Sequence, residues 1–135
     1  MNNARFTAGW AKLAEIDGAA GEQVMAALAP VAPDLGRYIV EFAFGDLYSR
    51  PGLDLTSREL ATVAALTVMG HAQPQLAVHV HGALNVGCSP QQVIEVMLQM
   101  VAYAGFPVVI NAVLTAQGVF QARGISLPLP ATPAD

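Results

Sequence analysis

The sequence predicts an all-α fold, a single-domain helical bundle of about six to seven helices. Apolar residues recur at helical spacing along most of the chain, alternating strand patterns are absent, and Gly and Pro separate the apolar segments. With 135 residues the chain is long enough for one domain with a sizeable core. We assign residues 1–126 to this domain and residues 127–135, which contain Pro128, Pro130 and Pro133, to a Pro-rich C-terminal tail.

The first half of the chain predicts three amphipathic helices. Each is followed by Gly or Pro, and the third ends at the turn 50–52. The three helices span Arg5–Ile16, Ala20–Leu28 and Asp34–Tyr48.

Four further helices are predicted in the second half. The first begins at Thr56, because Thr56 and Glu59 fit a capping box in which Glu59 bonds back to the helix start, and it ends before Gly70. A later helix opens with Ser89 as its N-cap and Pro90 at its first position. The three helices that follow Gly70 cover residues 74–86, residues 90–104 and, after Pro107, the segment to about Arg123.

Charged residues are scarce and unevenly distributed. Asp, Glu, Lys and Arg make up 12% of the sequence, about half the usual share, and only Glu95, Arg123 and Asp135 follow Glu59. The apolar runs of this half are shorter than the roughly 18–20 residues that span a membrane. We therefore expect no membrane partner. Instead we expect self-association to cover this half, since obligate subunit interfaces resemble a domain core.

The net charge and the cysteine content indicate which partners and which cellular compartment to expect. The net charge is −4 and the basic residues are scattered, so no nucleic-acid partner is expected. The single Cys88 allows no internal disulfide, and the N-terminus lacks a basic-then-apolar signal pattern. These features predict a cytoplasmic protein.

Two residues of the apolar half could act as acids or bases. Glu59 is interpreted first as a helix cap, and alternatively as a carboxyl group among apolar walls that takes part in proton transfer. His79 lies beside the apolar stripe of its helix, where it is either a hydrogen-bonded core residue or a general acid. His81 lies about 200° further around that helix and shares its face with Asn85, so the two histidines cannot face one pocket within a subunit.

Neither a metal ion nor an organic cofactor is expected. His79 and His81 lack the i, i+4 spacing of helical metal ligands, and there is no Cys pair or phosphate-binding Gly loop. Arg50, in the turn 48–52, is either solvated or, where this loop lines a pocket, a ligand for a substrate carboxylate.

Several segments, taken in their order and spacing, resemble the carboxymuconolactone decarboxylase family. The resemblance implies an all-α fold shared with alkylhydroperoxidase D and assembly as a homotrimer or homohexamer. It covers roughly residues 38–122. Its segments are residues 42–53, 56–66, 79–87, 95–99 and 103–107, followed by Asn111 and Ala112.

The redox branch of this family carries the pattern Glu…Cys-x-x-Cys-x-x-x-His. Counting back from His79, Ala72 and Gln75 occupy the two cysteine positions. Neither can form a thiolate, so disulfide-based peroxidase activity is not expected. The chain resembles the decarboxylase branch instead, in which the position of His81 is often Arg.

The resemblance implies a cofactor-independent carboxy-lyase, similar to 4-carboxymuconolactone decarboxylase, that acts on a small molecule in aromatic compound catabolism. Such an enzyme removes CO2 from an unsaturated carboxylated lactone through a dienolate, which is then protonated on carbon. We assign His79 and Glu59 as catalytic residues. The residues assigned to substrate binding are Arg50, His81, Asn85 and Tyr103.

Three alternative functions remain open at this stage. The protein could be a related acid–base enzyme acting on another enolisable cyclic substrate in a specialised pathway. It could be a non-catalytic oligomer that binds a small ligand. It could also be a thiol peroxidase that uses Cys88, although Cys88 has no resolving partner and we regard it as incidental.

Overall fold

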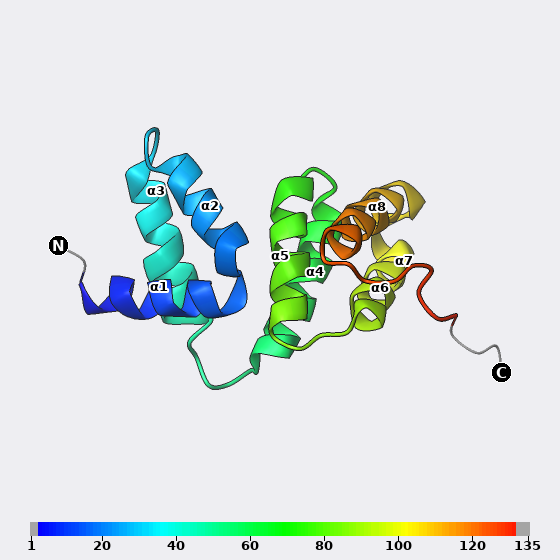
Figure 1. Ribbon diagram of the computed structural model, residues 1–135, viewed down its shortest axis with the longest axis horizontal. Coiled ribbons are helices and arrows are strands. Elements are labelled where there is room, and N and C mark those ends of the chain that lie inside the picture. The colour runs from blue at the N-terminus through cyan, green and yellow to red at the C-terminus, as the bar shows by residue number, and fades with distance from the viewer. Residues whose placement is uncertain (1–2, 132–135) are drawn as a thin grey trace.

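The computed structural model describes residues 3–131, and in this range every regular element is a helix (Figure 1). The predicted all-α class is therefore confirmed. In chain order the elements are α1 (Ala4–Ile16), α2 (Gly18–Leu28), α3 (Pro33–Tyr38), the π-helix η1 (Ile39–Leu47), α4 (Leu55–Met69), α5 (Gln73–Asn85), α6 (Pro90–Gln99), α7 (Val101–Ala104) and α8 (Phe106–Ala122).

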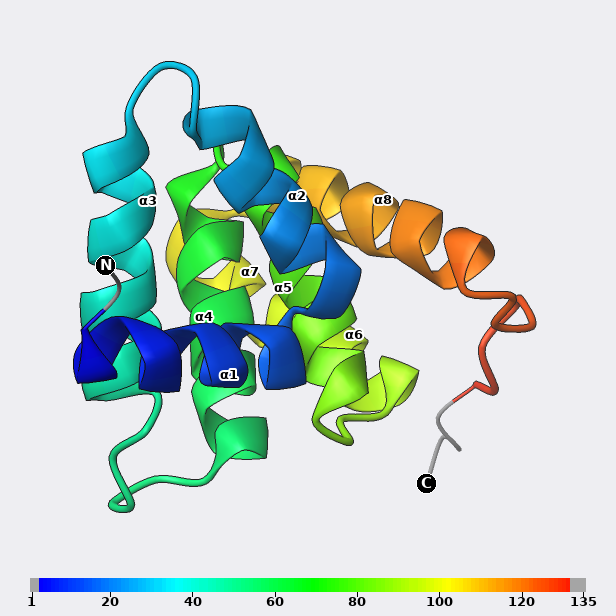
Figure 2. The same ribbon diagram turned by 60° about the vertical axis from the view of Figure 1, so that its left-hand side comes forward.

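The helices form two groups that lie side by side. The N-terminal group contains α1, α2, α3 and η1, and the C-terminal group contains α4 to α8 (Figures 1 and 2). Each group has its own cluster of buried apolar side chains, which includes Leu13 and Phe44 in the first and Val63, Val80 and Phe120 in the second. Both α1 and α2 contact α5, so α5 is the helix on which the two groups meet.

Very close packing holds α1 against η1. A Cβ at Gly9 of α1 would overlap the carbonyl oxygen of Val40, so only glycine permits this approach. Arg5, near the start of α1, forms ion pairs with Glu41 and Asp46 of η1. These contacts fix the position from which η1 lines the pocket described below.

The predicted helix over residues 34–48 is continuous, but it is not α-helical throughout. Its second part, Ile39–Leu47, is a π-helix, and the N–H of Tyr48 donates to the carbonyl oxygen of Ala43 over 2.9 Å. In the wider π-helical turn, residues four and five apart lie on one face. Ile39, Ala43, Phe44 and Tyr48 therefore all reach the same pocket. The predicted helix is therefore confirmed, and its π-helical winding is a feature that a hydrophobic pattern does not reveal.

The predicted start of the fourth helix was wrong. The N-cap of α4 is Asp54, whose carboxylate accepts from the backbone N–H of Ser57 over 2.8 Å and from the hydroxyl of Thr56 over 3.0 Å. Because the helix begins before Thr56, Glu59 lies beyond the first turn and points into the protein, where it is completely buried. The interpretation of Glu59 as the cap is therefore overturned.

Other boundaries follow the prediction with one exception. Ser89 and Gln92 form a complete capping box at the start of α6, as the Ser-Pro signal predicts. Gly70 ends α4 with a φ of +75°, a conformation that favours glycine. The single helix predicted for residues 90–104 is instead divided at Met100 into α6 and α7.

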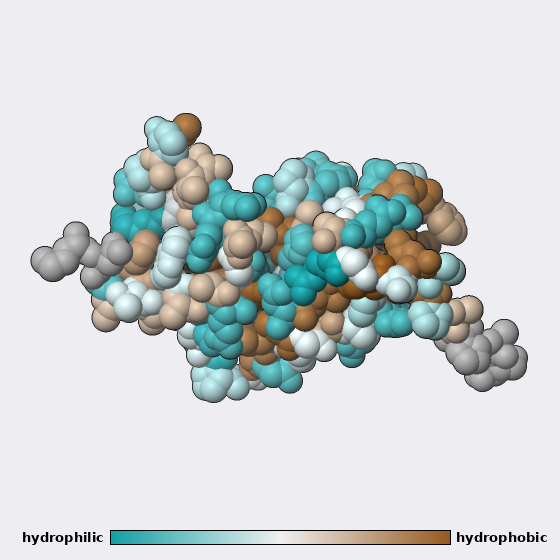
Figure 3. All heavy atoms as spheres, in the orientation of Figure 1, coloured by the Kyte–Doolittle hydropathy of each residue, from teal (hydrophilic) through white to brown (hydrophobic). Residues whose placement is uncertain are grey.

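The C-terminal group exposes large apolar side chains when the chain is alone. Phe106, Ile110 and Leu114 recur every four residues on one face of α8 and are 70%, 55% and 57% exposed. Apolar surface is visible over this half in Figure 3. No helix among the described residues is both long and apolar enough to cross a membrane.

Part of the predicted C-terminal tail packs onto the domain. Leu129 contacts the core cluster of the C-terminal group. Residues 132–135 of the tail lie outside the described residues, and the division of the chain at residue 126 stays a prediction.

Candidate active site

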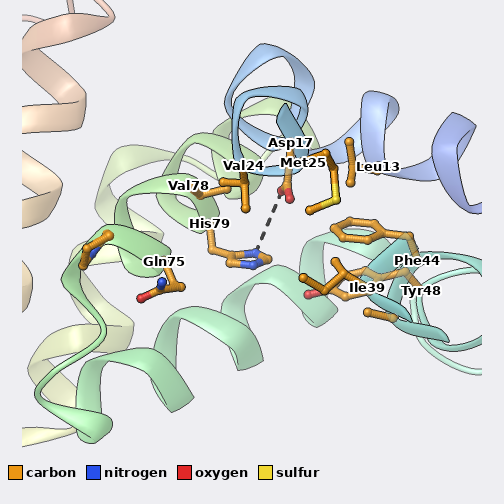
Figure 4. A pocket seen from close by; sticks show the side chains of 13 residues that line it. Leu13, Asp17, Val24, Met25, Ile39, Phe44, Tyr48, Gln75, Val78 and His79 are labelled. Carbon is orange, nitrogen blue, oxygen red and sulfur yellow. Dashed lines mark ion pairs between the residues drawn. The ribbon is translucent and has the colours of Figure 1, made fainter. Parts of the chain in front are cut away.

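A pocket of about 310 Å³ lies between the N-terminal group and α5 (Figure 4). Polar groups in its lining come from Asp17, Tyr48, Gln75 and His79. A small, mostly apolar cavity with a few convergent polar groups is typical of a ligand-binding site. Leu13, Val24, Met25, Ile39, Phe44 and Val78 form most of its apolar wall.

His79 of α5 and Glu59 of α4 form a hydrogen-bonded pair at this pocket. Nδ1 of His79 lies 3.1 Å from Oε2 of Glu59. The Glu59 side chain is completely buried, whereas that of His79 is 19% exposed. A carboxylate can only accept a hydrogen bond, so Nδ1 carries a proton and Nε2 is the ring nitrogen left for a ligand.

The surroundings of His79 favour its protonated form. Burial lowers the pKa of His79, but the hydrogen bond to Glu59 and the negative charges of Glu59 and Asp17 outweigh this effect. The pKa of His79 therefore lies above its usual range, and the side chain can act as an acid near neutral pH.

Asp17 is a site residue that the sequence analysis missed. It lies between α1 and α2, its side chain is 4% exposed, and its Oδ1 is 3.9 Å from Nδ1 of His79 (Figure 4). Burial raises the pKa of Asp17 to about 6; the negative charge of Glu59 adds to this rise and the charge of His79 opposes it. No sequence signal connects Asp17 with His79, because the contact forms only when the α1–α2 junction packs against α5.

Tyr48 is the second missed residue. Its hydroxyl is 2.8 Å from Oγ1 of Thr62, and its ring stacks on Phe44. Burial, followed by the negative charge of Glu59, raises the pKa of Tyr48 above its usual range. The phenol therefore stays neutral. Because the Thr62 hydroxyl donates to the carbonyl oxygen of Arg58, the Tyr48 hydroxyl donates its proton to Oγ1 of Thr62.

Arg50 and Tyr103 do not line this pocket within one chain. Arg50 is exposed in the turn after η1, and its carbonyl oxygen accepts from the guanidinium of Arg58 over 3.2 Å. Tyr103 lies on α7 and is 78% exposed. Their assignment to substrate binding stays a prediction.

His81 lies about 200° around α5 from His79, and neither His81 nor Asn85 lines the pocket of His79. Arg123 donates to Oδ1 of Asn85 over 2.9 Å, and its guanidinium is 3.4 Å from Nδ1 of His81. Asn85 also donates to the carbonyl oxygen of Ile16. Burial and the charge of Arg123 lower the pKa of His81. A role of His81 and Asn85 toward substrate stays a prediction.

Cys88 is poorly suited to thiol chemistry. It is buried, its Sγ donates to the carbonyl oxygen of Thr56, and burial raises the pKa of its thiol. The reactive species in peroxide reduction is the thiolate, which this environment disfavours. Cys88 is the single cysteine of the chain, so no second cysteine can act as its resolving partner.

Asp17, Glu59 and His79 also form a cluster whose donor atoms all lie within 4.8 Å of one another. Such a set has the chemistry to bind a cation. However, the hydrogen bond between Glu59 and His79 already uses one atom of each residue that an ion would need. The expectation that no metal ion binds stays a prediction.

Comparison with known proteins places the chain in a family. Residues 33–118 match the model of the carboxymuconolactone decarboxylase family. An uncharacterized 15.0 kDa protein of Paracoccus denitrificans is 35% identical over 71% of this chain and 72% of its own length. The 4-carboxymuconolactone decarboxylase of Acinetobacter baylyi is 34% identical over 69% of each chain.

A nitrosuccinic acid decarboxylase of Metarhizium robertsii is 35% identical over 58% of this chain and 54% of its own length. Two of these three relatives are thus named decarboxylases. The family model covers more than half of the chain, including Glu59 and His79, whereas Asp17 lies outside the matched segment. The chain belongs to the carboxymuconolactone decarboxylase family, as the order and spacing of its sequence segments predict.

Proposed function

We propose that this protein is a cofactor-independent decarboxylase that removes CO2 from an unsaturated carboxylated lactone. The names of two relatives support carboxy-lyase activity in general. The observation that carries the proposal is the hydrogen-bonded pair of Glu59 and His79 beside a mostly apolar pocket.

The apolar wall supports the first step, the loss of CO2. A carboxylate held against Leu13, Phe44 and Val78 lacks the solvation that stabilises its charge, whereas neutral CO2 does not need it. When the carbon–carbon bond to the carboxylate breaks, its electron pair moves through the ring double bond onto the lactone carbonyl oxygen. The lactone is thus the electron sink, and the product of this step is a dienolate.

His79 is suited to the second step. The developing oxyanion requires a hydrogen-bond donor, which the Nε2–H of His79 can supply. The dienolate then takes a proton on carbon, and we assign its delivery to Nε2 of His79. Glu59 accepts from Nδ1, which orients the ring and stabilises the imidazolium form.

A second part of the proposal concerns assembly. Among its lining residues the pocket has no Arg or Lys to anchor a substrate carboxylate. The apolar face of α8 supports self-association of the chain as a homotrimer or homohexamer. In such an assembly Arg50, His81, Asn85 or Tyr103 of a neighbouring subunit would supply substrate contacts that are missing within one chain.

Turnover of defined substrates tests the proposal. Purified protein is incubated with a panel of α,β-unsaturated γ-lactones that carry a carboxylate on the saturated γ-carbon, and CO2 release and loss of the substrate are followed together. We expect equimolar CO2 and decarboxylated lactone from wild type and a loss of at least about 100-fold in kcat for His79→Gln. Turnover without CO2 would instead favour the related acid–base enzyme on another enolisable substrate. An equal rate for His79→Gln would remove His79 from the mechanism.

A further inference from the structure

Asp17 occupies a position at which an aspartate normally caps a helix. It is the residue before α2, but its side chain makes no capping hydrogen bond and its backbone is α-helical instead of extended. Its carboxylate points toward His79 across the pocket (Figure 4). Asp17 therefore does not act as the N-cap of α2.

The carboxylate of Asp17 is buried without an ordinary partner. Among the described residues its Oδ1 accepts no hydrogen bond, and neither does Oε1 of Glu59. Burying an unpaired carboxylate is costly, so such a group either keeps a proton or depends on a nearby positive charge. The groups that face Asp17 are Glu59 from α4, Tyr48 from the end of η1 and His79 from α5, and only His79 can supply that charge.

Two glycines make room for this carboxylate. A Cβ at Gly82 of α5 would lie 2.8 Å from Oδ1 of Asp17 and 3.0 Å from Oε2 of Glu59. A Cβ at Gly21 of α2 would lie 2.7 Å from the Cβ of Asp17. Glycine at both positions therefore allows two carboxylates to approach one edge of the His79 ring.

We propose that Asp17 is a second positioning carboxylate of the active site, which acts together with Glu59 on Nδ1 of His79 to hold His79 as the imidazolium acid. The inference rests on the role of His79 in the function proposed above. It adds a residue from outside the segment that matches the family model. One carboxylate holds Nδ1 by a hydrogen bond at 3.1 Å, and the other adds its charge at 3.9 Å.

The charge balance explains why a second carboxylate matters. With His79 protonated and both acids ionised, the cluster carries one net negative charge. After His79 has given its proton to substrate, the cluster carries two negative charges inside a mostly apolar pocket. This state is unfavourable, so the cluster recovers a proton readily from solvent and is ready for another turnover.

NMR titration of the His79 ring tests the proposal without requiring any substrate. The signal is assigned by its loss in His79→Gln and is followed in wild type, Asp17→Asn and Glu15→Gln. Glu15 is an exposed acid at the end of α1, two residues before Asp17, and it pairs with Lys12, so Glu15→Gln is the matched control. We expect the pKa of His79 to fall by roughly one unit in Asp17→Asn and to be unchanged in Glu15→Gln.

A second measurement on wild type keeps the test independent of the variant's folding. The carboxyl carbon of Asp17, observed by carbon-detected NMR, should titrate well above the usual range for aspartate. An unchanged His79 titration in a folded Asp17→Asn, or an Asp17 carboxyl that stays protonated across the pH range in which His79 titrates, would overturn the proposal. Stoichiometric binding of Zn2+ or Mn2+ by wild type that is lost in Asp17→Asn would also overturn it, in favour of a metal site. None of these readouts depends on decarboxylation, so failure of the proposed function is recognised separately.

Discussion

Glu59 of α4 and His79 of α5 are joined by a hydrogen bond of 3.1 Å that couples a completely buried carboxylate to a histidine at the pocket. The pKa of His79 therefore depends on Glu59, a residue that is not part of the pocket lining.

The pH dependence of activity follows from this contact. His79 must be protonated to act as an acid, so kcat should fall as pH rises through a His79 pKa that lies above the usual range. Glu59→Gln removes the main cause of that rise, so the falling limb should move to lower pH. The measurement is kcat against pH from 5.5 to 9.5, with the exposed His71→Gln as control. A limb at the same pH in Glu59→Gln contradicts the assignment.

Asp17 should reduce the stability of the folded protein at neutral and higher pH. Its folded pKa of about 6 is above the unfolded value of 3.8, so the folded state binds more protons between these values and loses stability as pH rises through them. The loss is on the order of 3 kcal/mol. His79, whose pKa is also raised, contributes stability that is complete below its unfolded pKa and is lost as pH rises through the folded pKa.

Asp17→Asn should therefore raise the free energy of unfolding more at pH 8 than at pH 4.5, because the amide cannot ionise. Urea unfolding at both pH values checks this expectation, with Glu15→Gln as the matched acid-to-amide control. Equal effects of Asp17→Asn at the two pH values would show that ionisation of Asp17 carries no cost. A stability gain combined with a lower His79 pKa would show that the enzyme retains an unfavourable carboxylate for its chemistry.

Gly82→Ala should damage the site and the fold together. The added Cβ would meet both the Asp17 and the Glu59 carboxylates, so one of them must move. We expect a loss of roughly 1–3 kcal/mol in stability and a fall in kcat. Gly118→Ala is the control, because a Cβ at Gly118 of α8 meets nothing within 4 Å and alanine is the better helix former. Thermal unfolding and CO2 release measure the two effects.

The N-cap of α4 can be tested by replacing each of the two candidate residues with alanine. Asp54 accepts the hydrogen bond from the N–H of Ser57, so Asp54→Ala should lower Tm by a few degrees. Thr56→Ala should have a smaller effect, since the Thr56 side chain only donates to Asp54. A larger loss for Thr56→Ala would restore the capping box that the sequence predicts.

The outer face of α8 provides the test of self-association. Leu114→Lys places a charge among Phe106, Ile110 and Leu114, so we expect a lower oligomer mass by light scattering coupled to size-exclusion chromatography. Gln121→Lys adds the same charge on α8 at an exposed polar position and should leave the mass unchanged. A monomeric wild-type protein would contradict the proposed assembly.

The sequence by itself determined the helical class, most helix boundaries and the two central site candidates. Helical spacing of apolar residues and local signals such as Ser89 with Gln92 act within one or two turns, so they can be recognised without the rest of the chain. His79 and Glu59 stood out because ionisable side chains are rare in the second half.

Only the tertiary structure decided how these candidates are used. In the folded protein the N-cap of α4 is Asp54, and the Glu59 side chain is completely buried. The tertiary structure also brought Asp17 and Tyr48 to the same pocket from segments distant in the chain. Burial and pairing depend on which surfaces meet when the two helix groups pack, and this long-range outcome leaves no periodic or local signal in the sequence. The chemistry of the site therefore arises from helix packing, whereas the helices themselves arise from local pattern.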